Sequence, residues 1–388
     1  MKNQLTIIIL ALLFTQPALA QMMQLQKLNQ SDVGKISLGA YAQIDYNQPI
    51  SSDIRQNGKI DVHRLVMTMG YKFNKRTKFF TEIEYEHVKE VYIEQAFLSY
   101  KINDFINFKG GLVLIPMGII NERHEPNIFN GVERPNVDKY IIPTTWREVG
   151  AGFTGRIDDA SLKYQIYLVN GFNGYDGSAK LNGSNGLRKG RQKGAESYIS
   201  APNLSAKVDY YGFGNLKLGL ATYLGNTQST LYNGLDKNDE AAIAAADSSV
   251  VGIRMVGADA QYTKAGWQAR GQYILTSLSN TEAYNAFGNS DVGKMLTGYY
   301  VELGYDVLHN KKVASALIPF ARYEHYNTHA GTDEITTANK ALNKTELIFG
   351  LGWKPASGAI VKGDYQIIMT EGSDSPKYQL NFGVGLSF

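Results

Sequence analysis

A two-residue alternation of apolar and polar side chains runs through almost the whole chain and constrains its fold more than any other feature. From Tyr378 to Phe388, large apolar residues alternate with Gln, Asn, Gly and Ser. Successive side chains of a strand point to opposite faces, so each such stretch predicts a strand with one apolar and one polar face. The alternation recurs at residues 36–46, 295–306 and 347–354, and only residues 238–247 have a helical composition.

The connections between the expected strands alternate between short polar turns and longer loops. Seven short turns are expected near residues 74–76, 103–105, 157–160, 212–215, 264–266, 309–312 and 355–358. Eight longer or more variable connections are expected near residues 47–58, 88–90, 116–145, 171–200, 225–249, 277–292, 328–341 and 371–376. Seven turns at one end and eight loops at the other require sixteen antiparallel strands, and bacterial outer-membrane barrels have such an even number.

A soluble β-sandwich would show the same alternation, but the order of the connections favours a transmembrane barrel. Tilted strands of about nine to eleven residues cross the apolar layer of a membrane, and closure pairs every backbone group. Trp267 follows one short turn and Trp353 precedes another, as expected for an aromatic girdle at the membrane surface. The sequence therefore predicts an all-β chain with one antiparallel 16-stranded barrel, which is wide enough to enclose water.

The N-terminal residues have the form of a secretory signal peptide. Lys2 precedes an apolar stretch from Leu5 to Phe14, and small residues follow at the expected cleavage site. The expected division is a signal peptide at residues 1–20, a short N-terminal periplasmic segment at 21–34 and an outer-membrane barrel at 35–388.

Charge and cysteine content exclude several function classes. The formal net charge is +3, and removal of Lys2 lowers it to about +2, which gives no indication of a nucleic-acid partner. The chain has no cysteine, so disulfides, thiolate metal sites and cysteine nucleophiles are excluded.

Charged residues on the polar strand faces are expected to line the pore. Glu82 and Glu84 share one strand face, and a row of acids cannot face lipid. The same alternation places further charges on the pore wall, namely Arg64, Arg270, Glu302, Arg322 and Glu324. Two interpretations remain open: these charges pair with one another, or acids and arginines on opposite walls create a transverse field.

The third long connection is expected to fold into the barrel and narrow it. About thirty residues without strand alternation are unusual for a surface connection unless they are functional or disordered. Pro116 and Pro143 bracket this loop, and Phe129 and Tyr140 are apolar anchors that a solvent-facing loop would not need. Its candidate constriction residues are Glu122, Arg123, Glu125, Glu133, Arg134 and Lys139.

The fourth long connection contains a run of basic residues without an acid, Arg188, Lys189, Arg191 and Lys193. One interpretation is a solvated loop, or a loop that touches anionic lipopolysaccharide. The other is an extracellular basic collar that raises the local concentration of anions at the pore mouth.

Signals for catalysis or metal binding are scarce. Glu122, His124 and Glu125 lie close together, but no second His follows four residues later and Pro126 breaks the helix that such a motif needs. We therefore expect no metal, no cofactor and no enzymatic activity, although an outer-membrane enzyme stays open as an alternative.

Three successive blocks carry a family resemblance, namely residues 91–102 (VYIEQAFLSYKI), 107–118 (NFKGGLVLIPMG) and 133–153 (ERPNVDKYIIPTTWREVGAGF). Their succession resembles the phosphate-selective porin O and P family, in the form common among Bacteroidota. The resemblance implies a trimeric, 16-stranded outer-membrane channel whose third loop forms the constriction. It also implies an anion site of basic residues on the constricting loop and the nearby pore wall, with Arg134 and the wall residue Arg147 in the matching block and Arg123 and Lys139 on the same loop.

The expected function is passive diffusion of small hydrophilic solutes or ions across the outer membrane of a Gram-negative bacterium. A preference for anions such as phosphate is a further hypothesis. The expected partners are outer-membrane lipid and lipopolysaccharide, the permeating solutes, and two further copies of the chain in a homotrimer. The alternative from another class is a structural or adhesive barrel with little conductance.

Overall fold

The structure is a computed structural model of the 388-residue chain, and it describes residue 28 and residues 30–388. The expected signal peptide lies outside the described residues, as does most of the segment 21–34. Leu28 is buried inside the barrel, where a Cβ atom at Gly70 would lie 2.8 Å from Leu28 Cδ2. Glycine at position 70 therefore makes room for Leu28.

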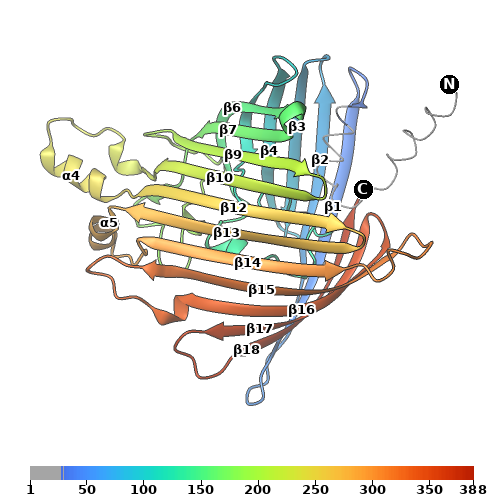
Figure 1. Cartoon of the computed structure of the whole chain (residues 1–388). Helices are drawn as coiled ribbons and strands as arrows, with labels where there is room; N and C mark the ends of the chain where they lie inside the picture. The colour runs from blue at the N-terminus through green and yellow to red at the C-terminus, as the bar shows by residue number, and fades with distance from the viewer. Residues whose placement is uncertain (1–27, 29) are drawn as a thin grey trace.

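Sixteen strands form one closed antiparallel barrel, as the sequence predicts (Figure 1). Each barrel strand pairs with its neighbours in the chain, and β1 closes the barrel against β18. The barrel strands are β1 (Ile36–Ile50), β2 (Lys59–Lys72), β3 (Thr77–Glu86), β4 (Glu90–Lys101), β5 (Asn107–Leu114), β6 (Arg147–Ile157), β7 (Leu162–Val169), β9 (Asn203–Phe213), β10 (Leu216–Asn226), β12 (Gly252–Lys264), β13 (Trp267–Ser279), β14 (Met295–Tyr305), β15 (Ala316–Gly331), β16 (Asn343–Ala356), β17 (Ala359–Thr370) and β18 (Lys377–Ser387).

Short helices and one small sheet lie in the connections. The sheet pairs β8 (Asn173–Tyr175) with β11 (Gln228–Ser229). The 3-10 turns are η1 (Asp158–Ala160), η2 (Arg188–Gly190), η3 (Thr230–Tyr232) and η4 (Lys340–Leu342), and the helices are α3 (Val137–Tyr140), α4 (Glu240–Ser248) and α5 (Thr281–Gly288). None of the described helices is long and apolar enough to cross a membrane.

Only α4 was expected from the sequence, and its start shows why. The side chain of Asp239 accepts a hydrogen bond from the backbone N–H of Ala242, which is a standard N-cap. Helix α5 instead follows Asn280, which has a left-handed backbone and makes no side-chain cap. A helix without a capping signal is hard to recognise within a sequence that is otherwise β-like.

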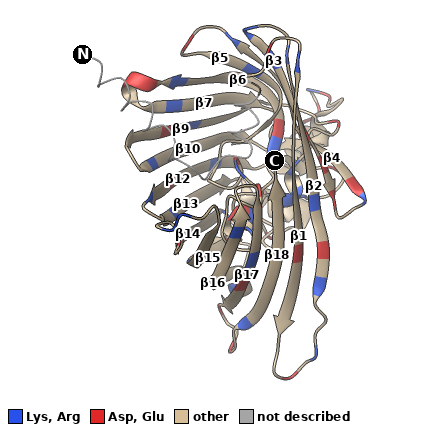
Figure 2. Cartoon of the chain, turned by 90° about the vertical axis from the view of Figure 1, so that its right-hand side faces the viewer, with Lys and Arg blue, Asp and Glu red and all other residues tan. Residues whose placement is uncertain are grey.

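The two faces of the barrel wall follow the predicted alternation. On β14, Val301 and Leu303 face outward and are 61% and 47% exposed, whereas Tyr300 and Glu302, which alternate with them, are buried. Trp267 and Trp353 lie exposed near the short turns, and the Trp267 ring packs against Tyr305. Long stretches of the strands carry no charged residue, and many charges lie near strand ends and in loops (Figure 2). The exposed apolar side chains, such as Val301 and Leu303, make the outer wall an apolar surface.

The third loop, residues 115–146 between β5 and β6, folds into the barrel as predicted. Glu122 reaches Lys207 on β9, Asn130 reaches Glu302 on β14, and the Val132 N–H donates to Asp364 on β17. The expected anchors Phe129 and Tyr140 also contact the wall: Lys362 Nζ lies 3.9 Å from the centre of the Phe129 ring, and Tyr140 stacks on Tyr326. The loop thus crosses the interior and is bound to several sides of the wall.

Apolar side chains of the third loop form a core inside the barrel, together with residues of the wall and of the fourth loop (residues 170–202). The loop residues of this core include Ile115, Met117, Ile119, Ile120, Phe129, Val137, Ile141, Ile142 and Trp146. Phe172 of the fourth loop stacks on Trp146 with ring centroids 4.7 Å apart. The third and fourth loops are therefore packed against each other and against the wall through this apolar core.

Candidate functional site

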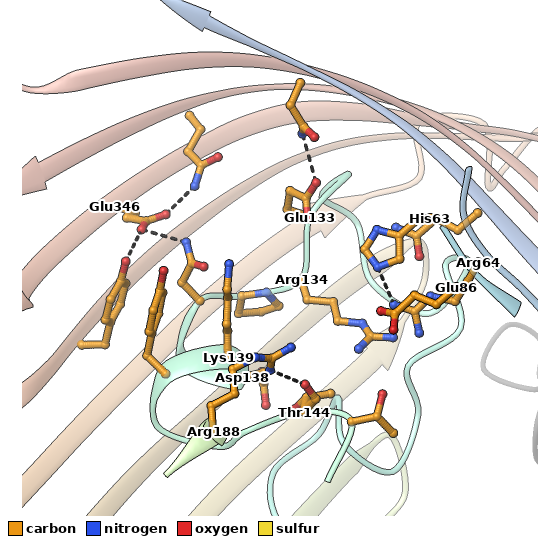
Figure 3. A pocket seen from close by; sticks show the side chains of 18 of the residues that line it. His63, Arg64, Glu86, Glu133, Arg134, Asp138, Lys139, Thr144, Arg188 and Glu346 are labelled. Carbon is orange, nitrogen blue, oxygen red and sulfur yellow. Dashed lines mark hydrogen bonds between the residues drawn. The ribbon is translucent and has the colours of Figure 1, made fainter. Parts of the chain in front are cut away.

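A cavity of about 760 Å³ lies inside the barrel between the third loop, the fourth loop and the wall (Figure 3). Its wall residues come from β1 to β4, β6 and β15 to β18. Nine of the lining residues are basic, namely Arg64, Arg134, Lys139, Arg147, Arg188, Arg191, Lys193, Lys344 and Lys377. Six are acidic, namely Glu84, Glu86, Glu90, Glu133, Asp138 and Glu346.

The acids of the cavity are held by neighbouring side chains. The partners are Arg64 for Glu84 (3.6 Å), His87 for Glu86 (3.9 Å), Asn47 for Glu133 (3.0 Å), Gln272 for Asp138 (3.1 Å), Tyr326 for Glu346 (2.7 Å) and Tyr92 for Glu90. Five of the six carboxylates thus have a hydrogen-bond donor or an arginine beside them, which reduces the negative charge that they present to the cavity. Glu86 has only the His87 ring, at 3.9 Å.

The arginines of the two loops are instead held by neutral groups. Arg134 donates to the carbonyl of His124, Arg188 to that of Thr144, and Arg191 to those of Pro143 and Thr145. Figure 3 shows Arg134 extending from the third loop toward the side of Arg64 and Glu86. A carbonyl satisfies a guanidinium N–H but does not cancel its charge.

Aromatic rings hold the other basic groups. Lys193 Nζ lies 4.5 Å from the centre of the Tyr92 ring and the Arg147 guanidinium 5.7 Å from it, while Lys139 lies 5.3 Å from the Tyr140 ring. In the described part of the chain, no salt bridge joins Arg134, Lys139, Arg147, Arg188, Arg191 or Lys193 to a carboxylate. The cavity therefore presents an excess of positive charge.

Burial and mutual repulsion act on the basic groups of the fourth loop. Burial, followed by the charges of Arg188 and Arg147, lowers the pKa of Arg191 to about 9. Burial, followed by the charge of Arg191, also lowers the pKa of Lys193. An anion bound among these cations would relieve the repulsion.

Three of the four basic residues in the run 188–193 of the fourth loop lie at the cavity inside the barrel. Arg188, Arg191 and Lys193 line the cavity, whereas Lys189 is exposed and is absent from the lining. The loop turns inward because its side chains bind the carbonyls of residues 143–145 of the third loop. Arg188, Arg191 and Lys193 therefore do not fit the expectation of a fully solvated loop.

The predicted constriction residues divide into two groups. Glu133, Arg134 and Lys139 line the cavity. Glu122 makes a 2.8 Å salt bridge to Lys207, Glu125 is buried, and Arg123 is half-buried; none of these three is among the lining residues. Glu122 anchors the loop to the wall.

The predicted pore-wall residues also divide. Arg64, Glu84 and Arg147 line the cavity, while the other five are placed elsewhere in the interior. Arg270 Nε lies 3.0 Å from Glu302, and Arg322 lies 3.4 Å from Glu302 and 3.7 Å from Glu324. These four residues form a chain of ion pairs across β13 to β15, as the paired-charge interpretation expects.

Sequence reasoning missed Glu94, which is fully buried on β4. The register between β3 and β4 shifts after the Glu82–Gln95 pair, and this irregularity turns both Glu94 and Gln95 inward. A β-bulge breaks the two-residue alternation, so alternation alone cannot place both side chains. The fifth wall residue, Glu82, accepts a 2.6 Å hydrogen bond from Gln95.

Solved structures with a similar fold are outer-membrane proteins, and they include a channel and a porin. DcaP of Acinetobacter baumannii aligns with 92% of this chain and 98% of its own at a TM-score of 0.60 and 14% identity. An anion-selective porin from Comamonas acidovorans aligns with 92% of this chain and all of its own chain, at a TM-score of 0.57 and 11% identity. OmpT of Vibrio cholerae in its trimer form aligns with 92% of this chain and all of its own chain, at a TM-score of 0.54 and 13% identity. These similarities establish the porin-like 16-stranded barrel fold.

Sequence comparison adds one relative. No known protein-family profile matches the chain, so the expected membership of the phosphate-selective porin O and P family gains no support beyond the porin-like fold. An uncharacterized protein of Aquifex aeolicus (strain VF5) is 30% identical over 349 residues, which are 85% of this chain and 75% of that protein. The chain, a closed 16-stranded barrel with the fold of outer-membrane porins, belongs to the same family as this Aquifex aeolicus protein.

Proposed function

We propose that the chain is a channel in the outer membrane of a Gram-negative bacterium, through which small hydrophilic solutes diffuse passively with a preference for anions. One observation carries the preference. The cavity has nine basic and six acidic lining residues, and five of the acids are paired or hydrogen-bonded, whereas the cations on its two loops are held by carbonyls and rings and form no salt bridge among the described residues. A low-dielectric wall focuses such an unbalanced charge and raises the local concentration of anions.

Phosphate is the anion that the arginine geometry favours within this proposal. Guanidinium groups recognise phosphate oxygens through paired N–H donors. Arg134 and Arg147 face the cavity, and the Nε of each has no hydrogen-bond partner among the described residues. A tetrahedral oxyanion in the cavity would meet two guanidinium groups that no described carboxylate pairs with in a salt bridge.

The membrane context and the assembly belong to the same proposal. The apolar outer face, with Trp267 and Trp353 near the short turns, suits contact with outer-membrane lipid and, at the loop end, with lipopolysaccharide. A homotrimer is supported by the similar fold of the trimeric OmpT of Vibrio cholerae. No part of the proposal requires a cofactor, a nucleic acid or a chemical step.

Reversal potentials across a planar bilayer in a potassium chloride gradient test the proposal. We expect an anion-selective potential in the wild type, and inhibition of the chloride current by added phosphate. Arg134→Glu should move the potential toward cations, while Arg123→Glu, the same charge change on the same loop but outside the cavity lining, should move it less. A cation-selective or unselective wild type would overturn the anion preference, and an absence of channels would overturn the diffusion function.

A further inference from the structure

We propose that His124 of the third loop binds a divalent first-row transition metal, such as Zn²⁺, together with Glu82 of β3 and Glu94 of β4. Each residue offers one ligand atom, and the three atoms lie within 4.8 Å of one another. All three side chains are at most 1% exposed. The ion would tie the third loop to the wall, which is a role separate from the passage of solutes.

The imidazole of His124 is already oriented for metal binding. Its Nδ1 lies 3.3 Å from the backbone oxygen of Asn121, and its Nε2 lies 2.9 Å from Oε2 of Glu94. Both ring nitrogens thus face acceptors, but a neutral imidazole carries only one proton. If that proton lies on Nδ1, a cation between Nε2 and the carboxylate removes the repulsion of two lone pairs. An Nδ1–H bond to a backbone carbonyl is the usual second-shell arrangement of a metal-bound His.

The carboxylate of Glu94 gives an independent indication. Its Oε1 is buried and accepts no hydrogen bond from an N–H or hydroxyl group of the described residues, and the carboxyl of Glu84 lies beside the same side chain. The strand irregularity beside Glu82 turns this side chain inward, and Tyr41 OH donates to its other oxygen at 3.1 Å. Buried carboxylates that lie side by side repel one another unless a proton or a cation offsets their charge, and a coordinated cation would supply that positive charge.

The donor set indicates the class of metal. One imidazole nitrogen and two carboxylate oxygens suit Zn²⁺ and similar first-row ions, which bind such ligands at about 2.0–2.2 Å. Ca²⁺ would require six to eight oxygen ligands. The three ligands come from positions 82, 94 and 124, so the local spacing around His124 does not reveal them.

Metal analysis of the protein without an affinity tag tests the proposal directly. The chain is refolded with Zn²⁺, dialysed against a weak chelator and analysed by elemental mass spectrometry and X-ray absorption. We expect about one zinc per chain, with only nitrogen and oxygen neighbours and one imidazole. A wild type that retains no zinc would show that His124 and Glu94 form only an ion pair, and would overturn the proposal.

Variants locate the ion and separate this proposal from channel function. Glu94→Gln and Glu82→Gln keep the side-chain size and should lose most of the zinc, as should His124→Ala if it folds. His325→Ala removes a histidine that contacts Thr345 on a distant part of the wall, and it should keep the zinc. Equal zinc in all variants would place the ion elsewhere and overturn the site. Metal content is measured without any conductance recording. A negative result for the metal site is therefore distinct from a negative result for the proposed channel.

Discussion

Nη1 of Arg191 donates a hydrogen bond of 3.0 Å to the backbone oxygen of Thr145, and this contact joins the fourth loop to the third loop inside the barrel. The same nitrogen also reaches the carbonyl of Pro143 at 3.2 Å. One side chain therefore both holds the fourth loop inward and places a positive charge at the cavity. Selectivity and loop position are coupled through this residue.

Arg191→Gln should reduce anion selectivity. Two unit charges about 6 Å apart in water interact by about 0.7 kcal/mol, which is a factor of about three. Loss of one positive charge disfavours anions and favours cations by about that factor each, so it should lower the anion-to-cation permeability ratio by about tenfold. The reversal potential in a salt gradient measures this ratio. Lys189→Gln is the matched control, because Lys189 lies two residues earlier in the basic run of the fourth loop but is exposed and outside the cavity lining. Equal effects of the two substitutions would contradict the assigned role.

Anion selectivity should fall as the pH rises from about 7 to about 10. The pKa of Arg191 is lowered to about 9 by burial and by Arg188 and Arg147, so Arg191 is charged at neutral pH and loses its charge through this range. The lowered pKa of Lys193 acts in the same direction. An arginine with an ordinary pKa would stay charged throughout. Reversal potentials at the two pH values provide the measurement, and Arg191→Gln should show a smaller change than the wild type.

The barrel could be predicted from the sequence because its rules are local. Alternation with a period of two, and the order of turns and loops, depend on neighbouring residues, so the strand number and the outward face of β14 follow from them. The inward third loop could be predicted for a similar reason, since anchors such as Phe129 and the bracketing prolines lie within the loop itself.

The arrangement of the site could not be predicted because it depends on contacts between distant segments. Arg191 meets Thr145 across 46 positions of the chain, and His124 meets Glu94 across 30. The shift in strand register that turns Glu94 inward also breaks the alternation used to place side chains. The charges were therefore visible in the sequence, while their partners were not.

Lys207→Ala should loosen the third loop and destabilise the barrel. Lys207 Nζ lies 2.8 Å from Glu122, 3.1 Å from Asp259 and 3.0 Å from the oxygen of Gly118. Loss of the amine leaves two carboxylates without their buried cation, which costs about 3–5 kcal/mol of unfolding free energy. Denaturant unfolding in detergent micelles measures the cost, and single-channel recordings should show added current noise from the freed loop.

A nearby lysine provides the control for Lys207. Lys163 lies 4.0 Å from the same Glu122 but is 46% exposed, so Lys163→Ala should cost less than about 1 kcal/mol. Similar losses for both variants would mean that general charge, rather than the buried contact, determines the stability.

Val301→Arg should impair folding into a membrane. Val301 lies close to the centre of β14, faces outward and is 61% exposed. Arginine on the lipid face at the midplane costs about 2–4 kcal/mol, whereas near the membrane surface it costs about 0–1 kcal/mol. Met295→Arg, on the same face at the loop end of the strand, should therefore be nearly neutral. Urea titrations of folding into lipid vesicles measure both values. If Val301→Arg folded as well as Met295→Arg, this face would not lie against lipid, and the membrane position of the barrel would have to be rejected.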